Sequence, residues 1–117
     1  MEYEVIFCVI NAGYSELVMD AAKEVGARGG TVMNAKGTAN KEAEQFFKIA
    51  IQPEKEVVMI LVPKEIKDDV LHAIYKHAGL KSEGSGIAFS MPVNHVVGLS
   101  PVTQIPSEEE PKQDNQN

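Results

Sequence analysis

The sequence has very little cysteine and no excess of positive charge. Its one cysteine, Cys8, excludes an intramolecular disulfide and a zinc cluster built from cysteines. Eleven basic residues stand against seventeen acidic ones, and the formal net charge is -6. The chain therefore lacks the basic surface that nonspecific binding of nucleic acid requires. We expect a cytoplasmic protein that binds no nucleic acid.

Long apolar runs are absent as well. No stretch approaches the roughly 20 apolar residues that a membrane-spanning helix needs. The opening residues MEYEV lack the basic and apolar segments of a signal peptide. We therefore expect no direct insertion into a membrane, although the protein could dock on a membrane protein.

Motifs for catalysis or metal binding are missing too. The sequence contains no G-x-S-x-G nucleophile elbow, so we expect no enzyme and assign no catalytic residue. His72 and His77 lie five residues apart, which places them on different sides of a helix rather than on one face. His95 is more simply a half-exposed strand residue, and Cys8 a small core residue. We assign no metal ligand.

The length and composition predict one folded domain with a polar tail. A chain of 117 residues with 44% hydrophobic residues can form a single core. From Ser100 onward, three prolines and the acidic triplet 108–110 are typical of disorder. We therefore divide the chain into a domain over 1–99 and a disordered acidic tail over 100–117.

Periodicity within the domain predicts two helices and at least four strands. Ser15 is expected to cap the first helix, and Gly26 and Gly79 to end the two helices. The segment Phe46 to Gln52, before Pro53, forms either one arm of a hairpin or part of a long bent strand. The expected strands are Tyr3 to Ile10, Gly30 to Lys36, Glu56 to Val62 and Ile87 to Val97, and the helices are Glu16 to Val25 and Ile66 to Ala78.

This order of elements predicts an α+β fold of the ferredoxin-like kind. A βαββαβ subunit has a four-stranded antiparallel sheet with both helices on one face. The segment VVMILV is apolar at consecutive positions, so both faces of the sheet require burial and self-association is expected. Pro92 places the last strand at an edge or a bulge.

Glycines gather at the expected strand ends, in Gly29-Gly30-Thr31, Gly37-Thr38 and Gly84-Ser85-Gly86. Backbone N–H groups exposed by glycine can hold a phosphate. Turn geometry explains the same residues equally simply. The spacing matches neither a dinucleotide fingerprint nor a P-loop.

Three segments together, GGTVMNAKG, IQPEKEVVMILV and GSGIAFSMPVNHVVGL, resemble the PII nitrogen-regulatory signal-transducer family. The resemblance extends from residue 3 to about residue 99. It implies a homotrimer whose sheets face inward, with adenine nucleotides in the three clefts between subunits. It also implies that the protein regulates a partner, such as a membrane transporter or a nitrogen-metabolism enzyme, by docking.

The resemblance assigns each nucleotide-contacting position to a residue of this chain. Ile60 matches the strand position whose backbone pairs with adenine, and Ser85 stands where the family commonly has aspartate. The complete set of matching positions is Gly29, Gly30, Thr31, Gly37, Thr38, Ile60, Gly84, Ser85, Gly86 and Ile87.

The chain also departs from the family pattern. Ile87 replaces a phosphate-contacting lysine, and Gly98 and Ser100 replace two arginines. The loop after Gly37 is short and lacks tyrosine, which excludes uridylylation of a loop tyrosine. At the magnesium and 2-oxoglutarate site of the family, Lys41 replaces a glutamine and Glu54 a lysine. Candidate effectors are AMP, ADP, ATP or another small anionic molecule, and their binding is expected to act on residues 37–46.

The main hypothesis is therefore a divergent PII-like regulator with a short T-loop. The alternative is a trimeric divalent-metal-binding or structural module, related to the cation-tolerance proteins that share the trimer architecture. In that alternative, His77, His95 and acidic residues are the candidate ligands.

Overall fold

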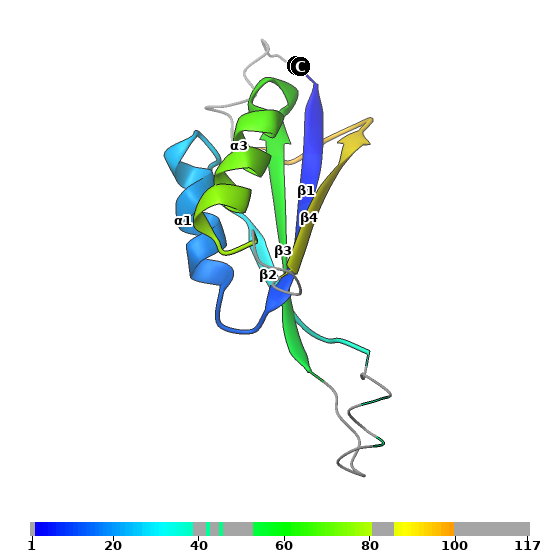
Figure 1. The fold of residues 1–117 in the computed structure, drawn as a ribbon. Helices are drawn as coiled ribbons and strands as arrows, with labels where there is room; N and C mark the ends of the chain where they lie inside the picture. The colour runs from blue at the N-terminus through cyan, green and yellow to red at the C-terminus, as the bar shows by residue number, and fades with distance from the viewer. Residues whose placement is uncertain (1, 39–41, 43–44, 46–52, 81–85, 100–117) are drawn as a thin grey trace.

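A computed structural model of the chain describes residues 2–38, 42, 45, 53–80 and 86–99. Figure 1 shows a sheet with two helices beside it. The elements, in chain order, are β1 (Tyr3–Asn11), α1 (Ser15–Glu24), β2 (Thr31–Lys36), β3 (Glu54–Pro63), α3 (Lys64–His77) and β4 (Gly86–Val93).

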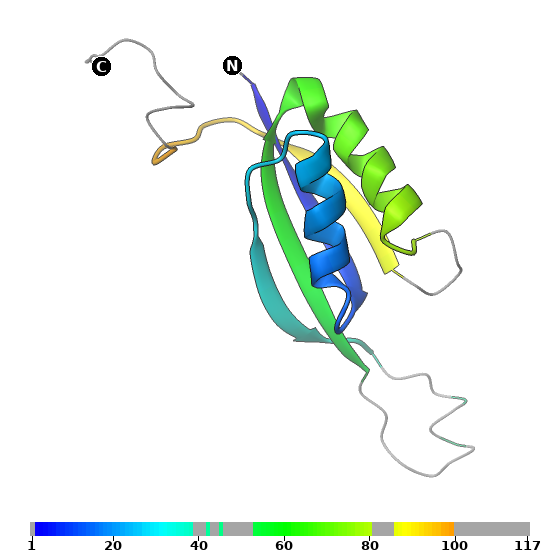
Figure 2. The same ribbon diagram turned by 90° about the vertical axis from the view of Figure 1, so that its left-hand side faces the viewer.

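The four strands form one antiparallel sheet in the order β2-β3-β1-β4. The two long strands β1 and β3 lie in the centre, and the shorter β2 and β4 form the edges. Both helices cover the same face, as Figures 1 and 2 show from two directions. The structure therefore confirms the ferredoxin-like subunit with both helices on one face that the sequence predicts.

The core lies between the sheet and the helices because each central strand alternates in burial. Ile6, Cys8 and Ile10 of β1 point toward the helices and are buried, as are Val58, Ile60 and Val62 of β3. The helices complete the core with Val18, Ala22, Val70 and Ile74. The intervening side chains of the strands lie on the opposite face of the sheet, which neither helix covers.

Most element boundaries differ from the sequence prediction by one or two residues, and the end of the last strand differs by four. Ser15 is the first helical residue of α1 rather than its cap, because the helix already begins with the bond from the Val18 N–H to the Tyr14 carbonyl. Tyr14 occupies the cap position without a side-chain hydrogen bond. The last strand ends at Val93 instead of Val97, where it pairs with Tyr3, the first residue of β1.

The predicted helix stops are confirmed. Gly26 and Gly79 follow the two helices with φ of 111° and 82°, a left-handed conformation that glycine adopts without steric cost. Leu17 and His77, which the helical period places with the apolar residues, are instead exposed because they lie at the margin of each helix's buried stripe.

The strand β3 begins at Glu54, so residues 54 and 55 belong to the strand and not to a turn. Residues 46–52, for which the sequence allows either a hairpin arm or part of a long bent strand, lie outside the described residues. Pro53 still approaches the end of β2, because its carbonyl accepts a 2.7 Å hydrogen bond from the Gly37 N–H. These two residues form a stem at the end of β2 and the start of β3.

Pro92 lies in an edge strand, as predicted. The register pairs Val93 with Tyr3 and Pro92 with Glu4. A Cβ at Gly86 would lie 2.7 Å from the Val9 carbonyl oxygen, so this carbonyl is directed toward β4. Because every second residue of a strand directs its peptide groups to the same side, Phe7, Val5 and Tyr3 also face β4. Val93 therefore faces β1, whereas the Pro92 nitrogen faces the free edge, where no ladder bond is lost.

The predicted tail over 100–117 lies outside the described residues and stays a prediction. In the described part of the chain, no helix is long and apolar enough to cross a membrane.

Candidate functional site

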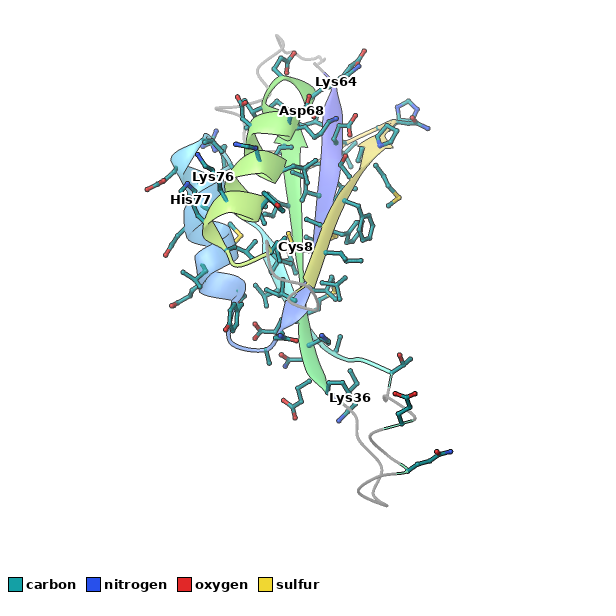
Figure 3. The ribbon with its side chains drawn as sticks, viewed as in Figure 1. Cys8, Lys36, Lys64, Asp68, Lys76 and His77 are labelled. Atoms are coloured by element: carbon teal, nitrogen blue, oxygen red, sulfur yellow. The ribbon has the colours of Figure 1, made fainter. Side chains whose placement is uncertain are left out.

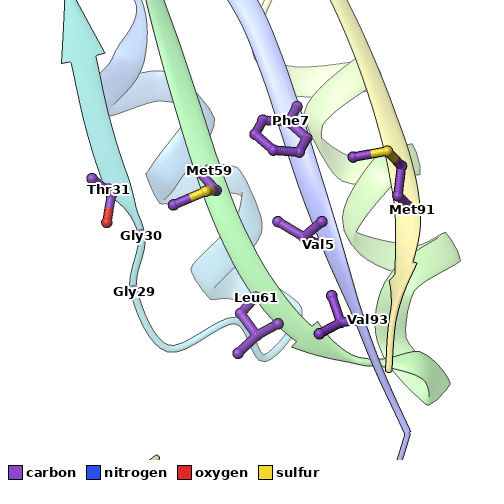
Figure 4. Close-up of a pocket in the computed structure, with 9 residues that line it drawn as sticks. All are labelled: Val5, Phe7, Gly29, Gly30, Thr31, Met59, Leu61, Met91 and Val93. Atoms are coloured by element: carbon purple, nitrogen blue, oxygen red, sulfur yellow. The ribbon is translucent and has the colours of Figure 1, made fainter. Parts of the chain in front are cut away.

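The uncovered face of the sheet carries a shallow hollow of about 560 Å³. Figure 4 shows its side chains pointing to the same side of the sheet, with Gly29 and Gly30 at the margin beside β2. Thr31 supplies the one polar side chain among the described lining residues, which are Val5, Phe7, Gly29, Gly30, Thr31, Met59, Leu61, Met91 and Val93. The structure thus places three of the predicted site residues in one apolar hollow.

Gly30 is required at this margin by a close approach of two backbones. A Cβ at this position would lie 2.9 Å from the Met59 carbonyl oxygen and 3.1 Å from Ile60 Cγ1. A Cβ at Gly29 would have no neighbouring atom within 4 Å, so packing requires glycine at position 30 but not at position 29.

The close approach of Gly30 to the Met59 carbonyl also shows which peptide groups of β3 face β2. The Met59 carbonyl is directed toward β2, and alternate residues of a strand direct their N–H and C=O to the same side. Leu61 therefore also faces the β2 side, while Ile60 faces Ile6 of β1. The described β2 ladder ends at the Thr31–Met59 pair. The Leu61 peptide lies two residues beyond the last pair of this ladder, Thr31 with Met59.

Gly37 and Thr38 lie at the other end of β2, at the stem of the loop. A Cβ at Gly37 would meet Lys55 Cε at 3.2 Å and Pro53 Cγ at 3.3 Å. The Lys55 ammonium continues past Gly37 to donate a 2.7 Å hydrogen bond to Asn11 Oδ1.

The turn after β1 is held to the same stem. The Gly13 N–H donates to Glu56 Oε1 at 3.1 Å, and the Ala12 N–H donates to the Glu54 carbonyl at 3.2 Å. This stem therefore links the turn before α1 to the start of β3.

A second hollow, of about 310 Å³, lies between α3 and β4. Gly86 and Ile87 line it together with Leu71, Tyr75, Leu80 and Ala88. Gly86 has φ of 147°, and a Cβ there would meet the Val9 carbonyl oxygen at 2.7 Å, so a side chain is excluded. Gly84 and Ser85 lie outside the described residues.

One subunit does not bring the predicted site residues together. Gly29, Gly30, Thr31, Gly37 and Thr38 follow the β2 edge, whereas Gly86 and Ile87 lie at the β4 edge. Three strand spacings separate these edges, a distance of about 14 Å. Ile60 is fully buried under the helices, and only its backbone could take part. A single subunit therefore leaves the predicted site residues in two separate groups at opposite edges of the sheet.

The sequence reasoning missed Met59, Leu61 and Tyr75. Strand alternation after Ile60 was the available signal for the first two, because neighbours of a buried strand residue must point to the other face. Tyr75 had no such signal, because only the packing of α3 against β4 places it beside Ile87.

Cys8 is not a reactive group. Its side chain is fully buried, and burial raises the pKa of the thiol to about 11. The prediction that it is a core residue is confirmed.

The candidate metal ligands are also not brought together. His77 lies on the surface at the end of α3, as Figure 3 shows, and His95 is exposed beyond β4. Within the described ranges, no group of three His, Cys, Asp or Glu side chains could hold a metal ion.

The fold and the paired hollows define a ferredoxin-like subunit whose glycine-lined margins lie at the two edges of one sheet. A family model described as "Nitrogen regulatory protein P-II" matches residues 3–102. The chain belongs to this family, as the sequence resemblance predicts. Members are generally regulatory signal transducers without enzymatic activity, and this chain is a PII-type regulatory protein.

A solved structure, the PII protein of Arabidopsis thaliana bound to citrate, has the same fold with a TM-score of 0.66. It is 22% identical, and the match covers 83% of this chain and 80% of that one. No individually curated protein gives a significant match.

Proposed function

We propose that the protein is a homotrimeric regulator that binds a small, adenine-nucleotide-like effector between subunits. In this proposal, effector binding alters docking to a partner protein, such as a membrane transporter or a nitrogen-metabolism enzyme, in the cytoplasm. The observation that supports it is the division of the predicted site into two half-sites on opposite sheet edges. The uncovered apolar face between those edges supports association of the subunits.

The β2 half-site supports recognition of adenine. The Leu61 peptide offers one N–H donor and one C=O acceptor beyond the described end of the β2 ladder. Adenine presents a complementary acceptor and amino donor along one edge of its ring. The Thr31 hydroxyl, at the start of β2, can add a third hydrogen bond. We therefore assign to Leu61 the backbone role that the resemblance gives to Ile60, whose peptide pairs with β1.

The wall around this peptide suits an aromatic ring. Met59, Leu61 and Val5 contribute apolar surface, and methionine sulfur makes favourable contacts with aromatic groups. Gly29 and Gly30 leave the margin open because they have no side chain. The other predicted contacts, Gly37, Thr38, Gly84, Ser85, Gly86 and Ile87, would surround the rest of the effector from two subunits.

Calorimetric titration tests this proposal. Adenosine, AMP, ADP, ATP, cyclic dinucleotides and citrate are each titrated into the assembled protein at up to millimolar concentration. At least one adenine compound should bind, at one site per subunit. The Thr31→Val variant should bind it about tenfold more weakly, because one hydrogen bond to the ligand is lost.

Thr31→Ser is the matched control, because it keeps the hydroxyl and should retain most of the affinity. Absence of binding by every adenine compound would overturn the proposed function. Equal binding by wild type and Thr31→Val would instead move the ligand away from the start of β2.

A further inference from the structure

In the described part of both hollows, the lining side chains carry no formal charge. In the described part of the β2 hollow, the Thr31 hydroxyl is the single polar side-chain group. In the hollow beside β4, the described lining has one polar side-chain group, the Tyr75 phenol. Neither described lining contains a lysine, an arginine or a histidine. This composition is informative because a polyphosphate normally requires several cationic contacts.

Neither Arg28 nor Lys55 is among the described residues that line the two hollows. Arg28 precedes Gly29 and is exposed, but it is not among the residues that line the β2 hollow. The Lys55 ammonium donates to Asn11 at the loop stem. The whole chain carries a formal net charge of -6, which opposes a highly charged anion at long range.

Ile87 and Tyr75 give the β4 hollow its apolar character. Ile87 is 60% exposed and Tyr75 is 50% exposed, which is a large exposure for such side chains beside a hollow. Leu71 and Leu80 contribute further apolar surface there. A charged phosphate placed against this wall would lose hydration without gaining a compensating ion pair.

We propose that the effector is a purine nucleoside derivative with at most one negative charge, whose uncharged part contacts Ile87 and Tyr75. This inference rests on the proposed function, because it names the ligand class of the same cleft. Leu61 and Thr31 of one subunit recognise the purine. Ile87 of the neighbouring subunit then excludes the polyphosphate forms.

The expected selectivity follows from the hydration that each ligand loses when it enters the cleft. Adenosine loses little hydration on entering an apolar cleft, whereas ATP must desolvate several negative charges. Each absent charge-assisted hydrogen bond is worth roughly tenfold or more in affinity. Adenosine and cyclic AMP, whose phosphodiester carries a single negative charge, should therefore bind within about threefold of each other, and ATP at least tenfold more weakly than adenosine.

Titration of the wild-type protein with adenosine, cyclic AMP and ATP, without magnesium and at fixed ionic strength, tests this order directly. The expected order needs no variant and so does not depend on the folding of a mutant. ATP binding as tightly as adenosine, or more tightly, would overturn the inference and leave the proposed cleft in place. Failure of all three to bind would overturn the cleft itself.

A charge introduced at Ile87 provides the second test. Ile87→Lys should increase the affinity for ATP about tenfold while leaving adenosine within about twofold, because the ammonium pairs with phosphate alone. Leu17→Lys is the matched control: it adds the same charge to an exposed residue of α1, outside both hollows. It should change neither affinity beyond twofold.

The pair of variants separates local from general electrostatics. An equal ATP gain in both variants would contradict the role of Ile87, because net charge alone would then explain it. No ATP gain in an Ile87→Lys protein of unchanged oligomeric mass would contradict it as well. Tyr75→Lys supplies an independent position on the same wall and should give a gain in the same direction.

Discussion

At the scale of single residues, Gly29 and Gly30 show that adjacent glycines can have different roles. Gly30 lies against the Met59 carbonyl, where a Cβ would be only 2.9 Å from oxygen, while Gly29 faces open space. The first is a requirement of the fold. The second leaves the margin of the hollow open without being needed for packing.

Replacing each glycine by alanine should separate these roles. Gly30→Ala should lower the free energy of unfolding by about 1 to 3 kcal/mol, because backbone must shift to admit the methyl group. Gly29→Ala should change it by no more than about 0.5 kcal/mol. Urea denaturation followed by circular dichroism measures both, and equal losses would contradict the difference in packing.

Cys8 gives a prediction in alkaline solution. Burial raises the pKa of its thiol from 9.0 to about 11, so the folded state holds a proton that the unfolded state releases. The resulting stability is fully present below pH 9 and is lost as pH rises toward 11, by roughly 2 to 3 kcal/mol.

The measurement compares unfolding free energies of wild type and Cys8→Ala between pH 8 and pH 11. The variant is less stable at every pH because it leaves a small cavity, but its loss between these pH values should be smaller. Parallel curves for the two proteins would contradict the assigned titration. Tyrosine and lysine titrations are common to both proteins and cancel in the comparison.

At the scale of elements, the sequence predicts type and order well and boundaries less well. The alternation around Ile6, Cys8 and Ile10 predicts β1, and glycine correctly marks the end of each helix. The end of β4 could not be predicted locally, because it depends on where the partner strand β1 begins. Ser15 was misplaced because a good capping residue can also occupy the first turn of a helix.

The candidate site was predictable to a smaller extent. Glycine clusters and the family resemblance indicate Gly30, Thr31 and Gly86, which the structure places at the hollows. Neither signal indicates that Leu61 rather than Ile60 has its peptide on the β2 side. That distinction depends on strand register, which a single sequence does not contain.

Pro92 on the edge of β4 leads to a prediction about unwanted pairing. Pro92→Val restores an N–H on the free edge and should change the unfolding free energy by less than about 0.5 kcal/mol. It should nevertheless increase aggregation on mild heating, measured by light scattering. Pro92→Lys restores the same N–H with a charged side chain and should aggregate less than Pro92→Val. Identical scattering by all three proteins would show that proline does not protect this edge.

At the scale of the whole molecule, the sheet face that the helices leave uncovered carries several exposed apolar side chains. Phe7 and Phe89 stack on it with ring centroids 5.6 Å apart and an interplanar angle of 27°. Phe89 and Met91 remain 42% and 46% exposed in the single subunit. Such a surface supports association through this face.

A charge placed on this face should dissociate the assembly. Wild-type protein should have a mass near three times the 12.7 kDa of the chain in light scattering coupled to size exclusion. Phe89→Glu should give folded monomers, because a carboxylate cannot be buried unpaired in the subunit interface. Leu17→Glu, on an exposed position of α1, should keep the wild-type mass. A wild-type monomer at micromolar concentration would contradict the homotrimer.

The stem at Gly37 and Pro53 has a further consequence for how the length of the segment between β2 and β3 can change in evolution. One backbone hydrogen bond closes the segment between β2 and β3, and the Lys55 and Glu56 side chains tie β3 to the turn before α1. Chain length beyond such a closure is inexpensive, since doubling a flexible loop adds only about 0.6 kcal/mol of closure entropy. Insertions and deletions at this point are therefore expected to change the length of the loop while the sheet and its core stay the same.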